Sequence, residues 1–194
     1  MTKKRLIGIT GGISTGKTTV ANYLQSAHQL PILDADIYAR EAVEIGSPIV
    51  QKIYQRYGQH LQLADGSLNR QALGAIIFTN QDERSWLEAQ IHPYVRNCFQ
   101  TQLNQLTTST VVLVIPLLFE ARLTQLVTEI WVVACSEQQQ LQRLMKRNNL
   151  NLEQAQARID SQLPLAQKIA AADLVLDNSS TQEYLFKQVD QALS

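Results

Sequence analysis

Residues 5–19 read RLIGITGGISTGKTT, and this segment sets the interpretation of the whole chain. The apolar run 5–10 predicts a short buried strand that ends at two glycines. Helical spacing of apolar side chains follows over residues 18–26. Between them, Gly11–Thr18 matches the pattern G-x-x-x-x-G-K-[ST] at every fixed position. A chance glycine-rich loop rarely has a strand before it and a helix after it, so the segment is interpreted as a phosphate-binding loop.

Each part of this loop has a physical role toward a nucleotide. Glycines let the backbone turn tightly and bring successive N–H groups close to phosphate oxygens. The positive end of the following helix adds to the attraction. Lys17 would place an ammonium group near the β- and γ-phosphates, and the Thr18 hydroxyl could bind Mg²⁺. The residues expected to bind ATP are Gly11, Gly12, Ile13, Ser14, Thr15, Gly16, Lys17, Thr18 and Thr19.

The composition is that of a globular protein with balanced charge. The chain has 194 residues, 45% of them hydrophobic and 18% charged, which is enough for one sizeable α/β core. Lys plus Arg and Asp plus Glu both number 17, and this balance argues against a nucleic-acid partner. No apolar run is long enough to cross a bilayer. With only Cys98 and Cys135 as thiols, we expect a cytoplasmic protein without a membrane partner; the sequence does not specify its oligomeric state.

Short apolar runs predict the remaining strands. They lie at residues 31–33, 111–118, 130–134 and 174–176. Because helical stretches separate them, we expect a three-layer α/β/α fold of the P-loop NTPase type, with a mainly parallel sheet. Two stretches interrupt the alternation of strands and single helices. One is a long helical stretch at 37–106, and the other is a shorter one at 136–167. The expected division is a nucleotide-binding core at 1–36, 107–135 and 168–194, a helical acceptor subdomain at 37–106 and a small helical lid at 136–167.

The shorter stretch carries helix caps and basic residues. Ser136 and Asn151 are placed to cap two helices, and the glutamines at 138–140 are expected on a solvated face. Arg143 and Arg147 are four residues apart and therefore share a helix face. A mobile hairpin carrying them could close over ATP, neutralise charge and exclude water. A basic face that is merely solvated accounts for the local sequence equally well.

Two carboxylates, Asp34 and Asp36, follow the second predicted strand. Residues i and i+2 of an extended chain point to the same side, so both side chains can face the crevice where the carboxyl ends of parallel strands gather. One carboxylate could take the proton of an attacking hydroxyl while the other orients it or holds a magnesium-bound water. The alternative is that the D-A-D segment only caps the next helix, which Asp36 could do alone.

Other classes of phosphate-loop protein are less well supported. The strings D-x-x-G and N-K-x-D, which a GTPase switch needs, do not occur in the chain. The aliphatic run at 111–118 ends without the aspartate that a mechanical ATPase uses for magnesium. A kinase for a small acceptor is favoured, and an ATP-binding module that transfers nothing remains the alternative of another class.

In their order, the motifs resemble those of the dephospho-CoA kinase family over essentially the whole chain. The matching residues are 8–13 and 16–19 in the loop, DAD at 34–36, Gly66, Leu68, Arg70, Leu73 and Phe78, IHP at 91–93, PLLFE at 116–120, Arg143, Arg147, Arg158, Ile159 and Gln162, and 172–173 with 177–178. The resemblance implies that ATP phosphorylates the ribose 3′-hydroxyl of dephospho-CoA in the last step of coenzyme A synthesis. A nucleoside or nucleotide acceptor is the nearest competing interpretation.

The resemblance also implies roles for individual residues. Asp36 would be the catalytic base, aided by Lys17 and by Arg143 or Arg147 at the phosphates. Asn178 would lie near the adenine. The residues implied on the acceptor side are Asp34, Asp36, Arg70 and His92. From the sequence alone, His92 could equally be a helix-boundary histidine and Arg70 a surface residue.

The chain departs from the family pattern at two places. The family loop more often has glycine and serine where this chain has Ser14 and Thr15, so Ser14 must adopt a conformation that glycine takes more freely. Asn148 and Asn149 follow Arg147, where the family often has an acidic residue.

Overall fold

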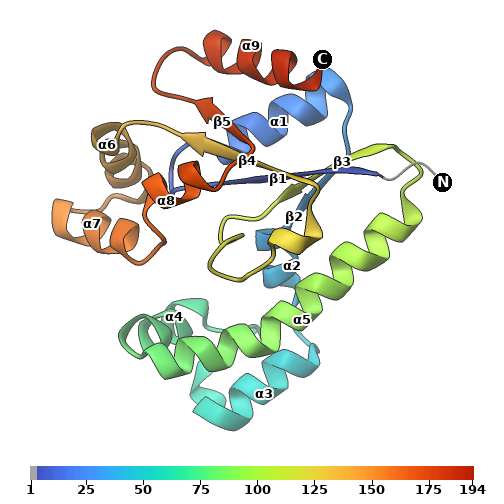
Figure 1. Ribbon diagram of the computed structural model, residues 1–194. Coiled ribbons are helices and arrows are strands. Elements are labelled where there is room, and N and C mark those ends of the chain that lie inside the picture. The colour runs from blue at the N-terminus through green and yellow to red at the C-terminus, as the bar shows by residue number, and fades with distance from the viewer. Residues whose placement is uncertain (1–3) are drawn as a thin grey trace. The chain divides into compact units, whose positions relative to one another are not determined.

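The strand that precedes the phosphate loop, β1 (Arg5–Gly11), lies at the centre of a five-stranded sheet of order β2-β3-β1-β4-β5 (Figure 1). The other strands are β2 (Ile32–Asp34), β3 (Thr110–Val114), β4 (Glu129–Ala134) and β5 (Leu174–Asp177). Every pair is parallel, and β1 is hydrogen-bonded to β3 on one side and to β4 on the other. The computed structural model describes residues 4–194, and the predicted α/β architecture is confirmed.

The aliphatic run expected as a strand at 111–118 is a strand only in its first half. β3 ends at Val114, and Ile115 still donates its N–H to the carbonyl of Ile9 at 2.9 Å. Turns follow from Pro116 to Arg122, since proline has no N–H for the ladder. The PLLFE string is therefore a turn segment at the carboxyl end of the sheet.

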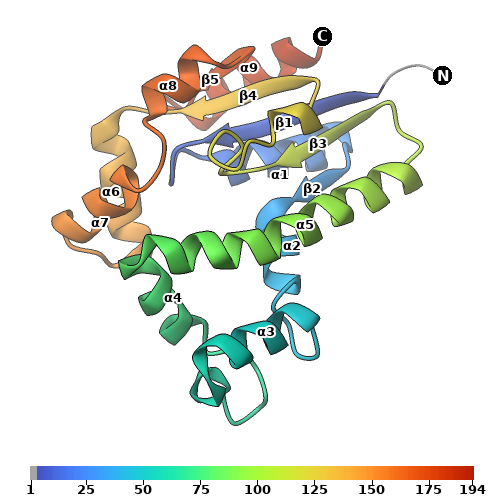
Figure 2. The same ribbon diagram turned by 60° about the horizontal axis from the view of Figure 1, so that its bottom comes forward.

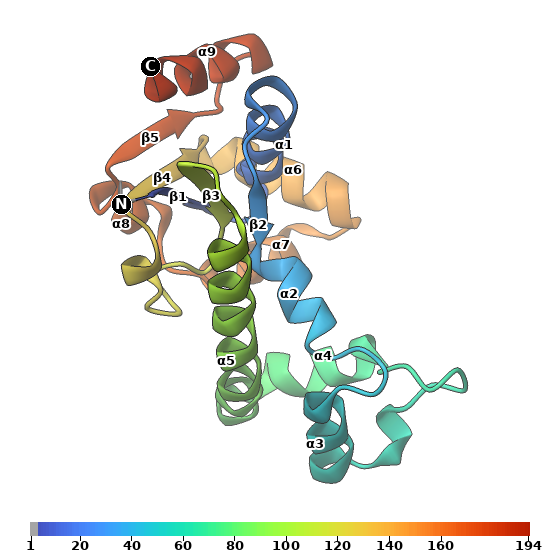
Figure 3. The ribbon, with the colours of Figure 1, turned by 90° about the vertical axis from the view of Figure 1, so that its right-hand side faces the viewer.

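Helices cover both faces of the sheet (Figure 3). α1 (Lys17–His28) and α9 (Gln182–Leu193) pack on one face, against the inward side chains of β1, β3 and β4. α8 (Leu165–Ala170) contacts β1 and β4. The buried side chains of the first face are Ile7, Ile9, Val20, Ala21, Leu24, Val112, Val114, Trp131, Val133, Leu176, Leu185 and Val189.

Beyond the carboxyl ends of β1 and β4, α6 (Glu137–Asn148) and α7 (Leu152–Asp160) lie side by side (Figure 2). Each begins with a reciprocal capping box, formed by Ser136 with Gln139 and by Asn151 with Gln154. Both predicted caps are confirmed. A short 3₁₀ helix, η2 (Thr124–Leu126), precedes β4.

The chain divides into two compact units, one from the residues up to Asp34 together with Thr107–Ser194, the other Ala35–Leu106. The second unit is helical and has its own core of apolar side chains. Its elements are α2 (Ala35–Glu41), α3 (Pro48–Tyr57), η1 (Gln59–Leu61), α4 (Arg70–Thr79) and α5 (Gln81–Gln105). Among residues 4–194, no helix is both long enough and apolar enough to span a membrane.

A polar cluster joins α3 to α5 within the second unit. Glu83 accepts hydrogen bonds from Arg56 at 2.7 Å and from Tyr57 at 2.6 Å. These bonds lower the pKa of the Glu83 carboxyl. Burial, together with the Glu83 carboxylate, raises the pKa of Tyr57 to about 12, so this hydroxyl stays protonated at neutral pH.

One ion pair in the first unit joins a buried cation to a partly exposed carboxylate. Lys168 of α8 is fully buried, and its Nζ lies 2.7 Å from Oε1 of Glu120 in the PLLFE segment. The same Nζ is 3.4 Å from the carbonyl oxygen of Pro116, which also accepts from the Thr10 hydroxyl at 3.1 Å. The pair therefore joins α8 to the turn segment beside β1.

We expect Glu120→Gln to lower the free energy of unfolding by about 1–3 kcal/mol, because it removes the counter-charge of the buried Lys168 ammonium, although the partly exposed position of Glu120 limits the loss. Urea unfolding followed by circular dichroism measures the change. The double variant Glu120→Gln/Lys168→Met, which removes the buried charge, should recover most of the loss. A single variant that unfolds at the wild-type urea concentration would show that the pair does not carry this stability.

Candidate nucleotide and acceptor sites

The phosphate loop connects β1 to α1 through two glycines that other residues cannot replace. Gly11 has φ +145° and Gly16 has φ +109°. A Cβ added at Gly11 would lie 2.3 Å from the carbonyl oxygen of Val133, and one at Gly16 would lie 2.2 Å from Nδ2 of Asn178. Gly16 is also the N-cap of α1 and offers no side chain to the first turn. The N–H groups of that turn can therefore serve an anion.

Ser14 adopts the left-handed conformation that its place in the loop requires, with φ +61°. Its hydroxyl oxygen is buried and has no hydrogen-bond partner among the described residues. A buried polar atom of this kind inside a phosphate loop fits a site built for a ligand that supplies the missing partner. The loop therefore fits a nucleotide phosphate.

Lys17 and Thr18 begin α1 directly below the loop. The Lys17 ammonium donates to the carbonyl oxygens of Gly11 at 3.2 Å and Gly12 at 2.7 Å. Thr18 is exposed in the first turn. Mg²⁺ prefers oxygen ligands and commonly keeps several of its waters. The ion itself is then bound by only one or two protein groups together with the substrate phosphates. The exposed hydroxyl of Thr18 suits this role.

Arg143 and Asn178 meet beside the loop. Asn178 donates its side-chain amide to the carbonyl of Thr15 at 2.8 Å, and Arg143 donates Nη2 to the backbone carbonyl of Asn178 at 3.0 Å. Nη1 of Arg143 is buried without a partner among residues 4–194. Arg147, one turn later in α6, is exposed and donates to Asn148 at 2.9 Å. The two arginines therefore occupy different environments.

Asp34 and Asp36 do not have the geometry that the sequence suggested. Asp34 is the last residue of β2, opposite Val114, but α2 already begins at Ala35. The D-A-D segment is therefore not extended, and the argument that residues i and i+2 of a strand share a side does not apply to it. Asp36 is the second residue of α2 and lies within its first turn, so it does not precede the helix as a cap would, whereas Asp34 does.

A cavity of about 270 Å³ in the second unit contains Asp36. Its walls are largely apolar, and its charged residues are Asp36, Arg40 and Arg70. Arg70 donates Nη2 to the carbonyl of Arg40 at 3.1 Å, which fixes one guanidinium at this cavity. The remaining lining residues are Ala39, Val43, Leu68, Leu73, Gly74, Ile77, Leu87 and Ile91.

His92 lies in the middle of α5, which continues through Pro93 to Gln105. The interpretation of His92 as a helix-boundary histidine is therefore wrong. It is partly buried, and its neighbour Ile91, rather than His92 itself, lines the 270 Å³ cavity. The structure thus brings Asp36 and Arg70 together and leaves His92 outside the lining.

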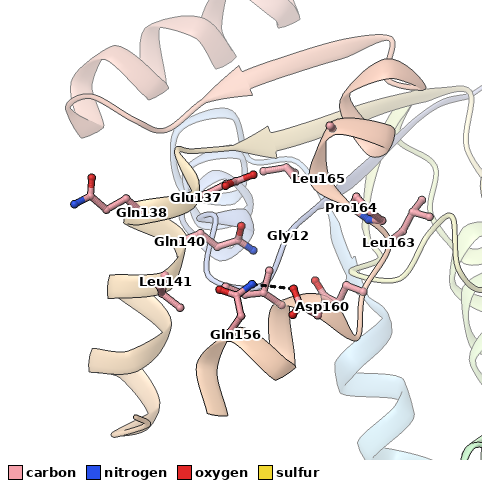
Figure 4. A pocket seen from close by; sticks show the side chains of 13 residues that line it. Gly12, Glu137, Gln138, Gln140, Leu141, Gln156, Asp160, Leu163, Pro164 and Leu165 are labelled. Carbon is pink, nitrogen blue, oxygen red and sulfur yellow. Dashed lines mark hydrogen bonds between the residues drawn. The ribbon is translucent and has the colours of Figure 1, made fainter. Parts of the chain in front are cut away.

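A second cavity, of about 590 Å³, lies in the first unit beside Gly12 (Figure 4). Glutamine side chains from α6 and α7 reach it, and Gln156 donates to Asp160 at its edge at 2.8 Å. Gln140 is only 3% exposed, and its Nε2 lies 2.5 Å from where a Cβ of Gly12 would be. The expectation that the glutamines at 138–140 lie on a solvated face is wrong for Gln140. Gln140 lies four residues before the buried Leu144, so both share one face of α6, and this spacing indicated that Gln140 is buried.

The chain is similar to known proteins over nearly its full length. A family model described as "Dephospho-CoA kinase" matches residues 5–183. Proteins named dephospho-CoA kinase from Trichormus variabilis and Synechocystis sp. are 67% and 57% identical; both alignments span 98% of this chain and cover 97% and 95% of those relatives.

Solved structures agree with the family match. A Thermus thermophilus protein has a TM-score of 0.81 at 31% identity, covering 98% of this chain and 97% of that one. The dephospho-CoA kinase from Campylobacter jejuni has a TM-score of 0.72 at 25% identity, covering 98% and 96%. Shikimate kinase from Aquifex aeolicus, at 14% identity and a TM-score of 0.57, shares the fold. The chain belongs to the dephospho-CoA kinase family.

Proposed function

We infer that this protein is an ATP-dependent kinase that phosphorylates the ribose 3′-hydroxyl of dephospho-CoA, which is the last step of coenzyme A biosynthesis. The observation that carries the assignment is a complete phosphate loop in a chain that matches the family over residues 5–183. The free thiols of Cys98 and Cys135 suit a reducing, cytoplasmic compartment.

ATP would bind with its phosphates on the loop from Gly11 to Thr19. The first-turn N–H groups of α1 and the Lys17 ammonium would stabilise the negative charge on the transferred phosphoryl group. Mg²⁺, held by the Thr18 hydroxyl and the phosphates, would neutralise part of that charge. Asn178 would adjoin the adenine, a role that suits its tie to Thr15.

The arginines of α6 would serve the nucleotide in different ways. Arg143 is anchored through Nη2 and keeps a buried Nη1 for the ligand, so it would be the catalytic arginine. Arg147 is exposed and would reach the nucleotide when the hairpin at 136–167 closes as a lid.

The cavity of the second unit would hold the acceptor. Its apolar walls suit the pantetheine arm, and the guanidinium groups of Arg40 and Arg70 suit the diphosphate. Asp36 would take the proton of the attacking hydroxyl, while Asp34 and His92 would act on the acceptor side. Because phosphoryl transfer has a loose transition state, the positioning and the charge of Asp36 should matter more than its basicity.

The acceptor is tested by measuring ADP formation with dephospho-CoA and with a panel of nucleosides and nucleotides. We expect dephospho-CoA to be strongly preferred. A preference for a nucleotide would overturn the acceptor assignment. ATP binding without any phosphorylated product would favour the non-transferring module instead.

For the base, we expect Asp36→Asn to lower kcat by roughly 100-fold or more, with little change in the Kd for ATP. Lys17→Ala should lower kcat and also raise the Kd for ATP, because Lys17 is assigned to the phosphates. Steady-state kinetics and calorimetric ATP titration give the two values. Asp82→Asn is the matched control, since Asp82 also lies in the first turn of a helix and carries no assigned role. Near-normal turnover of Asp36→Asn would refute the base assignment.

For the acceptor cavity, we expect Gly74→Leu to raise the KM for dephospho-CoA by about tenfold, or about 1.4 kcal/mol, and to leave the KM for ATP unchanged. A Cβ at Gly74 meets no atom within 4 Å, and Gly74 lines the cavity, so a larger side chain would occupy acceptor space.

Leucine also favours a helix over glycine by up to about 1 kcal/mol, so the variant should fold at least as well as the wild type. Ala75→Leu, at the exposed neighbouring position, is the control that should leave both KM values unchanged. A Gly74→Leu enzyme with an unchanged KM for dephospho-CoA would exclude this cavity as the acceptor site.

A further inference from the structure

The peptide that links Gly12 to Ile13 is fixed on both of its polar edges. On the carbonyl edge, the Gly12 oxygen accepts from Lys17 Nζ at 2.7 Å and from Thr15 Oγ1 at 2.9 Å. On the other edge, the Ile13 N–H donates to Oε1 of Gln162 at 2.9 Å. Gln162 and Lys17 therefore hold opposite sides of one planar unit, because the C=O and N–H of a peptide rotate together.

Gln162 is itself held in place. It lies between α7 and α8, and the N–H of the next residue, Leu163, donates to Oε1 of Glu120 at 3.0 Å. The same Glu120 oxygen pairs with the fully buried Lys168 at 2.7 Å. The chain around Gln162 is thus tied to the turn segment that follows β3, so its carboxamide has a fixed position from which to orient the loop.

A neutral acceptor suits this position. Gln162 and Gln140, the glutamines that meet the loop at Ile13 and Gly12, can form hydrogen bonds without adding charge. A carboxylate in place of Gln162 could accept the same N–H but would repel a triphosphate bound on the loop.

We propose that Gln162 is a positioning residue for Lys17: by holding the Ile13 N–H, it orients the Gly12–Ile13 peptide so that the Gly12 carbonyl steadies the Lys17 ammonium at the nucleotide site. This inference rests on the proposed binding of ATP at the loop. Without the Gln162 oxygen, only the carbonyl edge of the peptide is held, by Thr15 and Lys17, so its orientation is less restrained and the Gly12 carbonyl holds Lys17 less firmly.

The test is a double-variant cycle in the full-length chain, with the Kd for ATP measured by calorimetry in the wild type, Gln162→Met, Lys17→Ala and the double variant. Methionine keeps the length of the side chain and removes the acceptor. We expect Gln162→Met to weaken ATP binding about tenfold in the wild-type background and less than about twofold in the Lys17→Ala background. The KM for dephospho-CoA should not change, which a general loss of folding would not produce.

Gln156→Met is the matched control, because Gln156 and Gln162 both line the cavity of about 590 Å³, but Gln156 bonds Asp160 and not the loop. It should leave ATP binding unchanged. If Gln162→Met fails to fold, Gln162→Asn, which keeps the amide but is one methylene shorter, replaces it in the cycle.

A Gln162 variant that binds ATP within twofold of the wild type overturns the proposal, and so does an equal tenfold loss in both Lys17 backgrounds. Failure of the wild-type protein to bind ATP would instead overturn the proposed function. The two failures are therefore distinguishable.

Discussion

The turn from β1 into α1 is the constraint on which the other features depend. Within a few residues the chain must leave the centre of a parallel sheet, direct backbone N–H groups toward an anion and start a helix. Gly11 and Gly16 make this possible, since a side chain at either would meet Val133 or Asn178. β1 is held between β3 and β4, so the turn cannot relax by shifting the strand.

Several segments distant in sequence converge on that turn. Asn178 at the end of β5 bonds Thr15, Gln162 after α7 bonds Ile13, and Gln140 in α6 packs against Gly12. All three contribute neutral amides, which complement the backbone without competing for phosphate. The charged groups Lys17 and Arg143 also bond backbone carbonyls beside the turn, those of Gly11, Gly12 and Asn178.

The fold and the loop could be predicted from the sequence because they depend on local patterns. Apolar runs mark the strands, and Ser136 and Asn151 are recognised as caps from residues three positions away. The geometry at Asp34 and Asp36 could not be predicted in this way, because it depends on where β2 ends and α2 begins. The contacts that Gln140 and Gln162 make with the loop could not be predicted, although Gln162 matches the family pattern, because their partners are far away in the chain. The mid-helix place of His92 was missed because a proline usually indicates a helix end.

The order of the strands has a consequence for how the protein is made. β1 and the loop are synthesised before the strands that flank β1, and these follow only after the whole helical unit Ala35–Leu106. Pairings between such distant segments form slowly, because a long stretch of chain must be closed before any contact is gained. β1 and the loop are therefore completed late although they precede β3 and β4 in synthesis, because β1 has both of its neighbours only when β4 has joined the sheet.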